Sequence, residues 1–263
     1  MPVPIVLCYH ALSPSWTADI STTPERLERQ VRLLLGRGYR AVRFTEVVQS
    51  PDRGKLLAVT FDDAFASVAR HGAPVLARLG VPATLFVPTD HVDAGGLLQW
   101  PGIDRWRGGP WEQELEAMSW AEVAALQRSG WEIGSHTGSH PHLTTVDDGA
   151  LDAELVRSKA ACEQRLEGAC TAIAYPYGDV DARVATAAAR AGYAAGAALP
   201  GRLGDRDPMR WPRTGVYQVD DERRFRLKVS PAMTTLRRSP AWGAIREWGP
   251  VARASGRSGQ QVD

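Results

Sequence analysis

Leu56-Leu57-Ala58-Val59-Thr60-Phe61-Asp62-Asp63 is a largely apolar run that breaks abruptly at two acids. A run this short and this apolar is typical of a strand buried on both faces of a parallel sheet. Residues 64–79 carry a helical pattern that stops at Gly80. This stretch therefore predicts a strand–helix unit with two carboxylates at its junction.

The same alternation continues along the chain. The other expected strands cover residues 5–8, 83–87, 131–134, 171–174 and 193–197, and the other expected helices begin at Thr23-Pro24-Glu25 and cover 120–129, 150–166 and about 180–191. Six or more such α/β units favour a (β/α) barrel, or a distorted version of it, over a small doubly wound sheet. We expect one domain over 1–230 and a tail over 231–263 whose last dozen residues are disordered.

Composition narrows the class of protein. The 263 residues are 44% hydrophobic and 23% charged, as in ordinary globular proteins, and the net charge of +1 gives no support to nucleic-acid binding. Cys8, Cys162 and Cys170 are an odd set without CxxC spacing, so we expect no disulfide framework. The N-terminus lacks a basic signal-peptide region, and no apolar run approaches the ~20 residues of a membrane span. The expectation is a soluble, cytoplasmic protein of open oligomeric state.

Asp62 and Asp63 fall at the carboxyl end of the expected strand 56–61. In a barrel, catalytic side chains gather at that edge. Adjacent acids face different directions there, so one can bind a metal while the other acts as a base. The alternative is that one of them caps the following helix.

His136, His140 and His142 are half of the six histidines and directly follow the expected strand 131–134. On a helical turn, His136 and His140 would lie on one face and share a metal ion. His142 is either a neighbour of that site or an exposed residue. One carboxylate with two imidazoles leaves coordination positions on the metal open for water and substrate, as in catalytic zinc sites. Non-haem iron uses the same ligands.

Three segments together resemble the motifs of the polysaccharide deacetylase family, also called the NodB homology domain. Thr60-Phe61-Asp62-Asp63 resembles the first motif, Ser135 to Pro141 the second, and Ala174-Tyr175-Pro176-Tyr177-Gly178 the third. Their order and separation match, and the likeness covers most of residues 3–230. The resemblance implies a catalytic domain with a distorted (β/α) barrel that hydrolyses N-acetyl groups on amino sugars.

The resemblance also implies roles for individual residues. Asp63, His136 and His140 would bind a divalent metal, usually zinc, with cobalt or nickel as substitutes. Asp62 would be the general base, and the backbone N–H of Tyr177 would help to hold the oxyanion. The metal would polarise the carbonyl and activate water, and the oriented donor would stabilise the developing charge.

The sequence departs from the family pattern in three places. Ala64 stands where the first motif commonly has Gly, and Ala174 stands where the third often has an Arg that orients the catalytic Asp. Arg213 is a candidate replacement for that Arg, and also a candidate substrate contact. The general acid is usually a His late in the domain, but no histidine follows His142.

His10 is a candidate for the general acid. Val6-Leu7-Cys8-Tyr9-His10 resembles the N-terminal segment of a subgroup that deacetylates poly-N-acetylglucosamine, in which this His is the acid. The alternative is a His that contacts substrate or supports the site.

Residues 92–118 lack periodicity and form an expected loop. Its Trp100, Trp106 and Trp111 are candidates to stack on sugar rings, or they simply pack.

Three functions remain open at this stage. A carbohydrate N-deacetylase is favoured, because a lapsed site has no reason to keep both the base and the metal ligands. A carbohydrate-binding protein without activity would explain the altered third motif and the missing late His. A metal-dependent amidase acting on a small non-carbohydrate C–N substrate is the third. A cytoplasmic enzyme would meet a nucleotide- or lipid-linked amino sugar sooner than finished polymer, but the sequence does not identify the sugar or the native metal.

Overall fold

The computed structural model describes residues 3–51, 54–92, 96–199 and 207–239. The expected disorder of the last dozen residues lies outside these ranges. The strands are β1 (Ile5–Tyr9), β2 (Ala11–Leu12), β3 (Ser21–Thr22), β4 (Arg40–Ala41), β5 (Leu56–Phe61), β6 (Ala83–Val87), β7 (Glu132–Ser135), β8 (Ala172–Ala174), β9 (Ala195–Ala198), β10 (Trp211–Pro212) and β11 (Thr214–Gly215).

The main sheet is a nearly closed parallel barrel. Its order is β10-β9-β8-β7-β6-β5-β1-β11, with β4 paired to the start of β5, while β2 and β3 pair separately. β10 pairs with β9 and β11 pairs with β1, yet only Arg213 separates β10 from β11. Residues 211–215 therefore join the two edges of the sheet. The expected distorted (β/α) barrel is confirmed.

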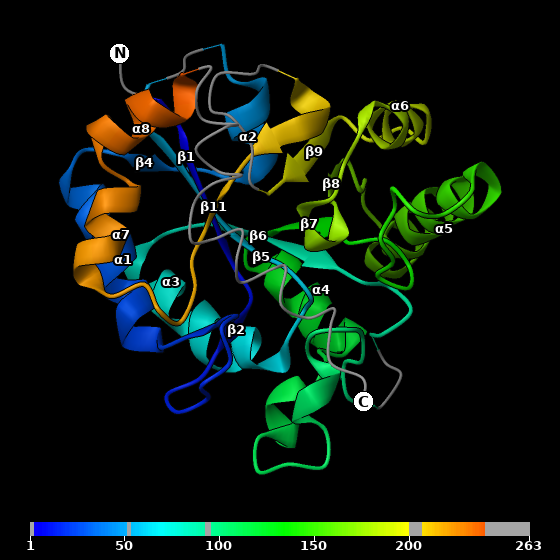
Figure 1. Ribbon diagram of the computed structural model, residues 1–263, viewed down its shortest axis with the longest axis horizontal. Coiled ribbons are helices and arrows are strands. Elements are labelled where there is room, and N and C mark those ends of the chain that lie inside the picture. The colour runs from blue at the N-terminus through cyan, green and yellow to red at the C-terminus, as the bar shows by residue number, and fades with distance from the viewer. Residues whose placement is uncertain (1–2, 52–53, 93–95, 200–206, 240–263) are drawn as a thin grey trace, which may run out of the picture.

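Helices surround the strands, as Figure 1 shows. They are α1 (Pro24–Gly36), α2 (Phe44–Gln49), α3 (Ala73–Leu79), α4 (Trp120–Arg128), α5 (Asp148–Leu166), α6 (Ala182–Arg190), α7 (Glu222–Lys228) and α8 (Pro231–Arg238). Short turns are the π-helix η1 (Val68–Gly72) and the 3-10 helices η2 (Asp104–Trp106), η3 (Glu112–Leu115), η4 (Pro176–Gly178) and η5 (Pro208–Arg210). Local signals set several ends: Thr23 caps α1, Ser119 and Glu122 form a capping box on α4, and Gly80 ends α3 in a left-handed conformation.

Alternate residues of the strands point into the barrel. Val6 on β1 and Ala58 on β5 are register partners and pack in one buried cluster with Phe86. Because side chains alternate along a strand, Cys8 and Thr60 lie on that same inward face, one step closer to the carboxyl edge. Small inward residues, such as Ala58, leave room inside the barrel for larger polar side chains.

Several segments differ from the sequence prediction, among them the helices α2 and α7, which no expected helix covers. The expected helix 64–79 begins with an irregular turn and contains η1 before α3, because Phe65 forms a bridge to Ala117. Residues 96–118 are not wholly irregular but include η2 and η3. Residues 231–238, expected in the tail, form α8, whose Arg237 donates to the Arg213 carbonyl and to Thr214 Oγ1. The domain therefore extends past residue 230. No helix among the described residues is long and apolar enough to cross a membrane.

Candidate metal centre and catalytic site

Asp62 and Asp63 leave the end of β5 in different directions. Asp63 and Ala64 both have left-handed backbones, with φ of 72° and 54°. This turn points the Asp63 carboxylate at the histidines that follow β7, whereas Asp62 faces Arg213. The alternative in which one acid merely caps a helix is not what the structure shows.

Asp63, His136 and His140 converge in a buried group. Asp63 Oδ1 lies 3.3 Å from Nε2 of each imidazole. His136 Nδ1 lies 2.8 Å from the Ala174 carbonyl oxygen, which can only accept a hydrogen bond. In the neutral imidazole, Nε2 therefore carries the lone pair, and it faces Asp63. Burial alone would raise the pKa of Asp63, but the two imidazoles outweigh it and lower that pKa.

This donor set fits a divalent metal. Within the described ranges, Asp63 Oδ1 and His140 Nδ1 are buried without a hydrogen-bond partner. Ligand atoms about 2.1 Å from one ion stand roughly 3.0 to 3.4 Å apart, which agrees with both 3.3 Å separations. The Nε2 lone pair of neutral His136 and the Asp63 carboxylate oxygen repel each other unless a cation or a proton lies between them. One carboxylate and two imidazoles suit zinc, cobalt or nickel better than magnesium or calcium.

The loop that carries His140 is not a helical turn, so that sequence expectation is wrong. Thr137 and His140 have φ of 67° and 63°. The Glu154 carboxylate on α5 accepts from the backbone N–H groups of Gly138 and Ser139 at 2.8 and 2.9 Å. Thr137 Oγ1 accepts from the His140 N–H. Side-chain acceptors, rather than helical spacing, therefore bring the two imidazoles together.

Asp62 is held by a buried guanidinium. Arg213 Nη1 and Nη2 donate to the two carboxylate oxygens of Asp62, each at 2.7 Å, and Nη1 also reaches Thr60 Oγ1. Burial alone would raise the pKa of Asp62, but Arg213, through its charge and its hydrogen bonds, and the nearby His136 and His10 together lower that pKa. The Arg213 side chain is 0% exposed, so it cannot touch a substrate here and holds Asp62 instead.

Cys8 and His10 lie on the other side of Asp62. Cys8 Sγ donates to Asp62 Oδ2 at 3.4 Å, and burial raises the pKa of its thiol well above the usual range. One imidazole nitrogen of half-buried His10 lies within 4.8 Å of both groups. Sequence reasoning gave Cys8 no role at the site. The alternation of side chains along residues 6–10 and 58–62 was the available signal.

Aromatic rings border the metal group. Trp100 stacks on His140 with centroids 4.1 Å apart, and Tyr177 stacks on His142 at 3.8 Å. Tyr177 is 39% exposed, whereas Trp100 is buried. Trp106 and Trp111 are partly buried and pack against the main core. Contact of Trp100, Trp106 and Trp111 with sugar therefore stays a prediction, and the Tyr177 ring is the exposed aromatic surface that sequence reasoning overlooked.

Left-handed backbone is concentrated at this edge of the barrel. Six described non-glycine residues have positive φ, and five of them, Asp63, Ala64, Thr137, His140 and Tyr177, belong to the three strand-end loops of the site. Each such residue costs about 1 kcal/mol or more, so the surrounding fold must enforce it. Strain of this kind is typical of functional sites.

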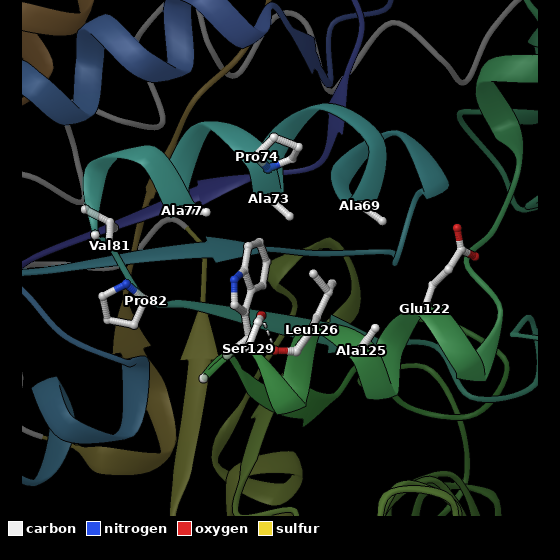
Figure 2. Close-up of a pocket in the computed structure, with 13 residues that line it drawn as sticks. Ala69, Ala73, Pro74, Ala77, Val81, Pro82, Glu122, Ala125, Leu126 and Ser129 are labelled. Atoms are coloured by element: carbon white, nitrogen blue, oxygen red, sulfur yellow. Dashed lines mark hydrogen bonds between the residues drawn. The ribbon is translucent and has the colours of Figure 1, made fainter.

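A separate hollow lies away from these loops. A cavity of about 690 Å³ lies between α3 and α4 and is lined by Ala73, Leu126 and Trp131, among others (Figure 2). None of its lining residues belongs to the metal group, and most of them are small or apolar. We therefore assign the chemistry to the strand-end loops and not to this cavity.

Comparison with known proteins adds independent findings. The sequence profile of the family described as polysaccharide deacetylase matches residues 49–196, more than half of the chain. A Bacillus subtilis (strain 168) protein, YxkH, which carries a provisional name as a polysaccharide deacetylase, is 23% identical over 87% of this chain and 72% of its own length. A Staphylococcus aureus poly-beta-1,6-N-acetyl-D-glucosamine N-deacetylase is 21% identical over 61% of this chain, and the match spans only 54% of that relative.

Solved structures share the fold. The deacetylase PplD of Streptococcus pyogenes superposes with a TM-score of 0.70 at 19% identity, covering 86% of this chain and 98% of its own. IcaB of Ammonifex degensii superposes with a TM-score of 0.66 at 23% identity, covering 90% and 97%. At these identities the likeness supports the barrel and leaves the substrate open.

Proposed function

Because the chain belongs to the polysaccharide deacetylase family, we propose that it is a metal-dependent hydrolase that removes N-acetyl groups from an amino sugar and releases acetate. The observation that carries this proposal is the convergence of Asp63, His136 and His140 beside a second carboxylate, Asp62, that is held apart by Arg213. A binding protein without activity has no need for that separation of two adjacent acids.

Each residue has a part in amide hydrolysis. Asp63, His136 and His140 would hold the metal, which supplies a Lewis acid for the carbonyl and activates water. Asp62, kept ionised by Arg213, would accept the proton of the attacking water. The backbone N–H of Tyr177 would donate to the oxyanion. His10 would deliver a proton to the departing amine nitrogen.

The substrate class rests on fewer observations. The name of the Staphylococcus aureus relative specifies poly-beta-1,6-N-acetyl-D-glucosamine, and the exposed Tyr177 ring offers a face on which a sugar can stack. We propose an N-acetylated amino sugar in a carbohydrate chain or conjugate.

The test is acetate release by the full-length protein, stripped of metal and reconstituted with zinc, cobalt or nickel. The panel contains N-acetylglucosamine oligomers, nucleotide-linked N-acetyl sugars and small acetamides. Release from the sugars after reconstitution is expected. Release only from the small acetamides would support the amidase alternative, and binding without release would support the inactive one.

The ligand assignment has its own readout. His136→Ala should lose most of its metal under mild chelation, because one of three protein ligands is gone, whereas exposed His71→Ala should keep it. Stoichiometric metal in the His136 variant would show that the metal is held elsewhere.

A further inference from the structure

We propose that Cys8, His10 and Asp62 form a second metal site, selective for thiophilic divalent ions such as zinc, and that its occupation inhibits the enzyme. The binding claim stands on its own geometry. The inhibition claim rests on the proposed function, because it assigns roles in catalysis to Asp62 and His10.

The donor atoms are already gathered. One ligand atom from each of Cys8, His10 and Asp62 lies within 4.8 Å of the others, and Cys8 and Asp62 are buried. Cys8 Sγ and Asp62 Oδ2 are 3.4 Å apart. A tetrahedral zinc ion with ordinary bonds to sulfur and oxygen holds those two atoms about 3.6 Å apart. Little movement is needed to admit the ion.

His10 supplies the third donor and the access route. Its Nδ1 is buried and has no hydrogen-bond partner within the described part of the chain. The rest of the side chain is only half-buried. An ion can therefore arrive from the His10 side without opening the barrel interior.

The neighbouring Arg213 does not block the site. A carboxylate has about four lone-pair positions, and the two hydrogen bonds from Arg213 occupy two of them. The Cys8 S–H points at Asp62 Oδ2, so its proton lies between the two atoms that an ion would bridge. Binding breaks the S–H bond, forms a metal–sulfur bond and releases one proton to solvent. The electron pair stays on sulfur.

Ligand chemistry sets the choice of ion. Thiolate and imidazole favour zinc, cobalt and cadmium, whereas magnesium and calcium prefer oxygen. The Asp63–His136–His140 group contains no sulfur. The two sites are therefore distinguishable by spectroscopy.

Inhibition follows from the shared residues. An ion on Asp62 occupies the lone pairs that would accept a proton, and an ion on His10 occupies a nitrogen that would carry one. We expect activity to rise with the first equivalent of metal and to fall as the second site fills.

The experiment is a cobalt titration of the full-length protein, after metal removal, followed by absorption. Filling the first site should give only weak visible bands, whereas filling the second should add an intense near-ultraviolet thiolate-to-cobalt charge-transfer band. Cys8→Ser should abolish that band and lower the affinity for the second equivalent of cobalt about 10-fold to 100-fold, while the first equivalent still binds. Cys170→Ser removes a buried thiol outside the group and should keep the band.

Two outcomes would overturn the site: no charge-transfer band in the wild-type protein, or a band that persists in Cys8→Ser. If Cys8→Ser does not fold, as judged by circular dichroism, His10→Gln keeps the thiol and should weaken the second equivalent alone. Acetate release measured on the same samples separates the claims. An inactive protein that still shows the Cys8-dependent band refutes the proposed function and retains the site, and an active protein whose second equivalent does not inhibit refutes the inhibition.

Discussion

Arg213 donates hydrogen bonds to both carboxylate oxygens of Asp62, each at 2.7 Å, although the two residues are 151 positions apart in the chain. The barrel explains the meeting. Arg213 lies between β10 and β11, where residues 211–215 join the two edges of the sheet. The segment that closes the barrel therefore also positions Asp62, the proposed base.

Arg213→Lys should lower turnover about 10²-fold with metal content unchanged. Lysine keeps the charge but cannot hold two oxygens in a fixed plane, and small misplacement of a catalytic group is costly. Arg213→Met, which leaves the Asp62 carboxylate buried without its cationic partner, should cost roughly 3–5 kcal/mol of unfolding free energy. Arg32→Lys, in an exposed pair, is the control and should change neither quantity measurably. Wild-type turnover by the Arg213→Lys variant would show that Arg213 does not position Asp62 for catalysis.

Asp62→Asn should bind the first equivalent of metal normally and lose ~10² to 10⁴ in rate, because an amide of the same shape cannot accept the proton. Asp63→Asn should instead lose metal. Metal analysis alongside kcat distinguishes the two variants. If the first equivalent of metal is lost from the Asp62 variant, the roles of the two acids are reversed.

Glu154→Ala should weaken metal binding about 10-fold to 100-fold without touching a ligand. Its carboxylate accepts from the Gly138 and Ser139 backbones, which fixes the loop that carries His140. Glu154→Gln retains one acceptor oxygen and should lose less. Asp152→Ala, on the same helix and in an exposed pair with Arg190, is the matched control. Competition with a chelator measures the affinities, and equal affinity in the Glu154→Ala and Asp152→Ala variants would exclude this role.

Gly178→Ala should destabilise the protein more than Gly80→Ala and should also reduce turnover. Both glycines are left-handed, with φ of 72° and 64°, so both variants carry about 1–2 kcal/mol of strain. At Gly178 an added Cβ would come within 2.3 Å of the Leu199 carbonyl oxygen, whereas Gly80 faces open space. The clash would shift Tyr177, the neighbouring residue. Chemical denaturation of both variants tests this, and equal losses would mean that the loop relaxes around the methyl group.

Periodicity was sufficient for most of the fold. The boundaries predicted for residues 56–61 and 83–87 agree with β5 and β6 because those runs are apolar, short and bounded by turn residues. The start of the helix after β5 was misjudged, since the bridge between Phe65 and Ala117 joins residues far apart in sequence. Local patterns carry no information about such a pairing.

The sequence indicated which types of residue make up the candidate site, but not the contacts that hold them in place. The strand ends indicated two adjacent acids and a histidine cluster, and the family resemblance implied that Asp63 is the acid on the metal. The left-handed backbone at Thr137 and His140 depends on acceptors such as Glu154, which no helical spacing indicates. Cys8 was missed because a lone cysteine carries little signal until the register of β1 and β5 is known.

His10→Ala should depress turnover of unactivated acetamides strongly and affect esters with good leaving groups much less. The amine released by amide hydrolysis is far too basic to depart unprotonated, so an acid must reach its nitrogen. No histidine follows His142 in the sequence. His10 lies at the end of β1, half-buried and within 4.8 Å of Asp62, and an imidazole exchanges protons near neutral pH. Activated esters leave without protonation and need no such acid. The kcat values of both substrates, measured at one equivalent of metal, decide the matter: equal losses with metal intact would assign His10 to substrate positioning instead.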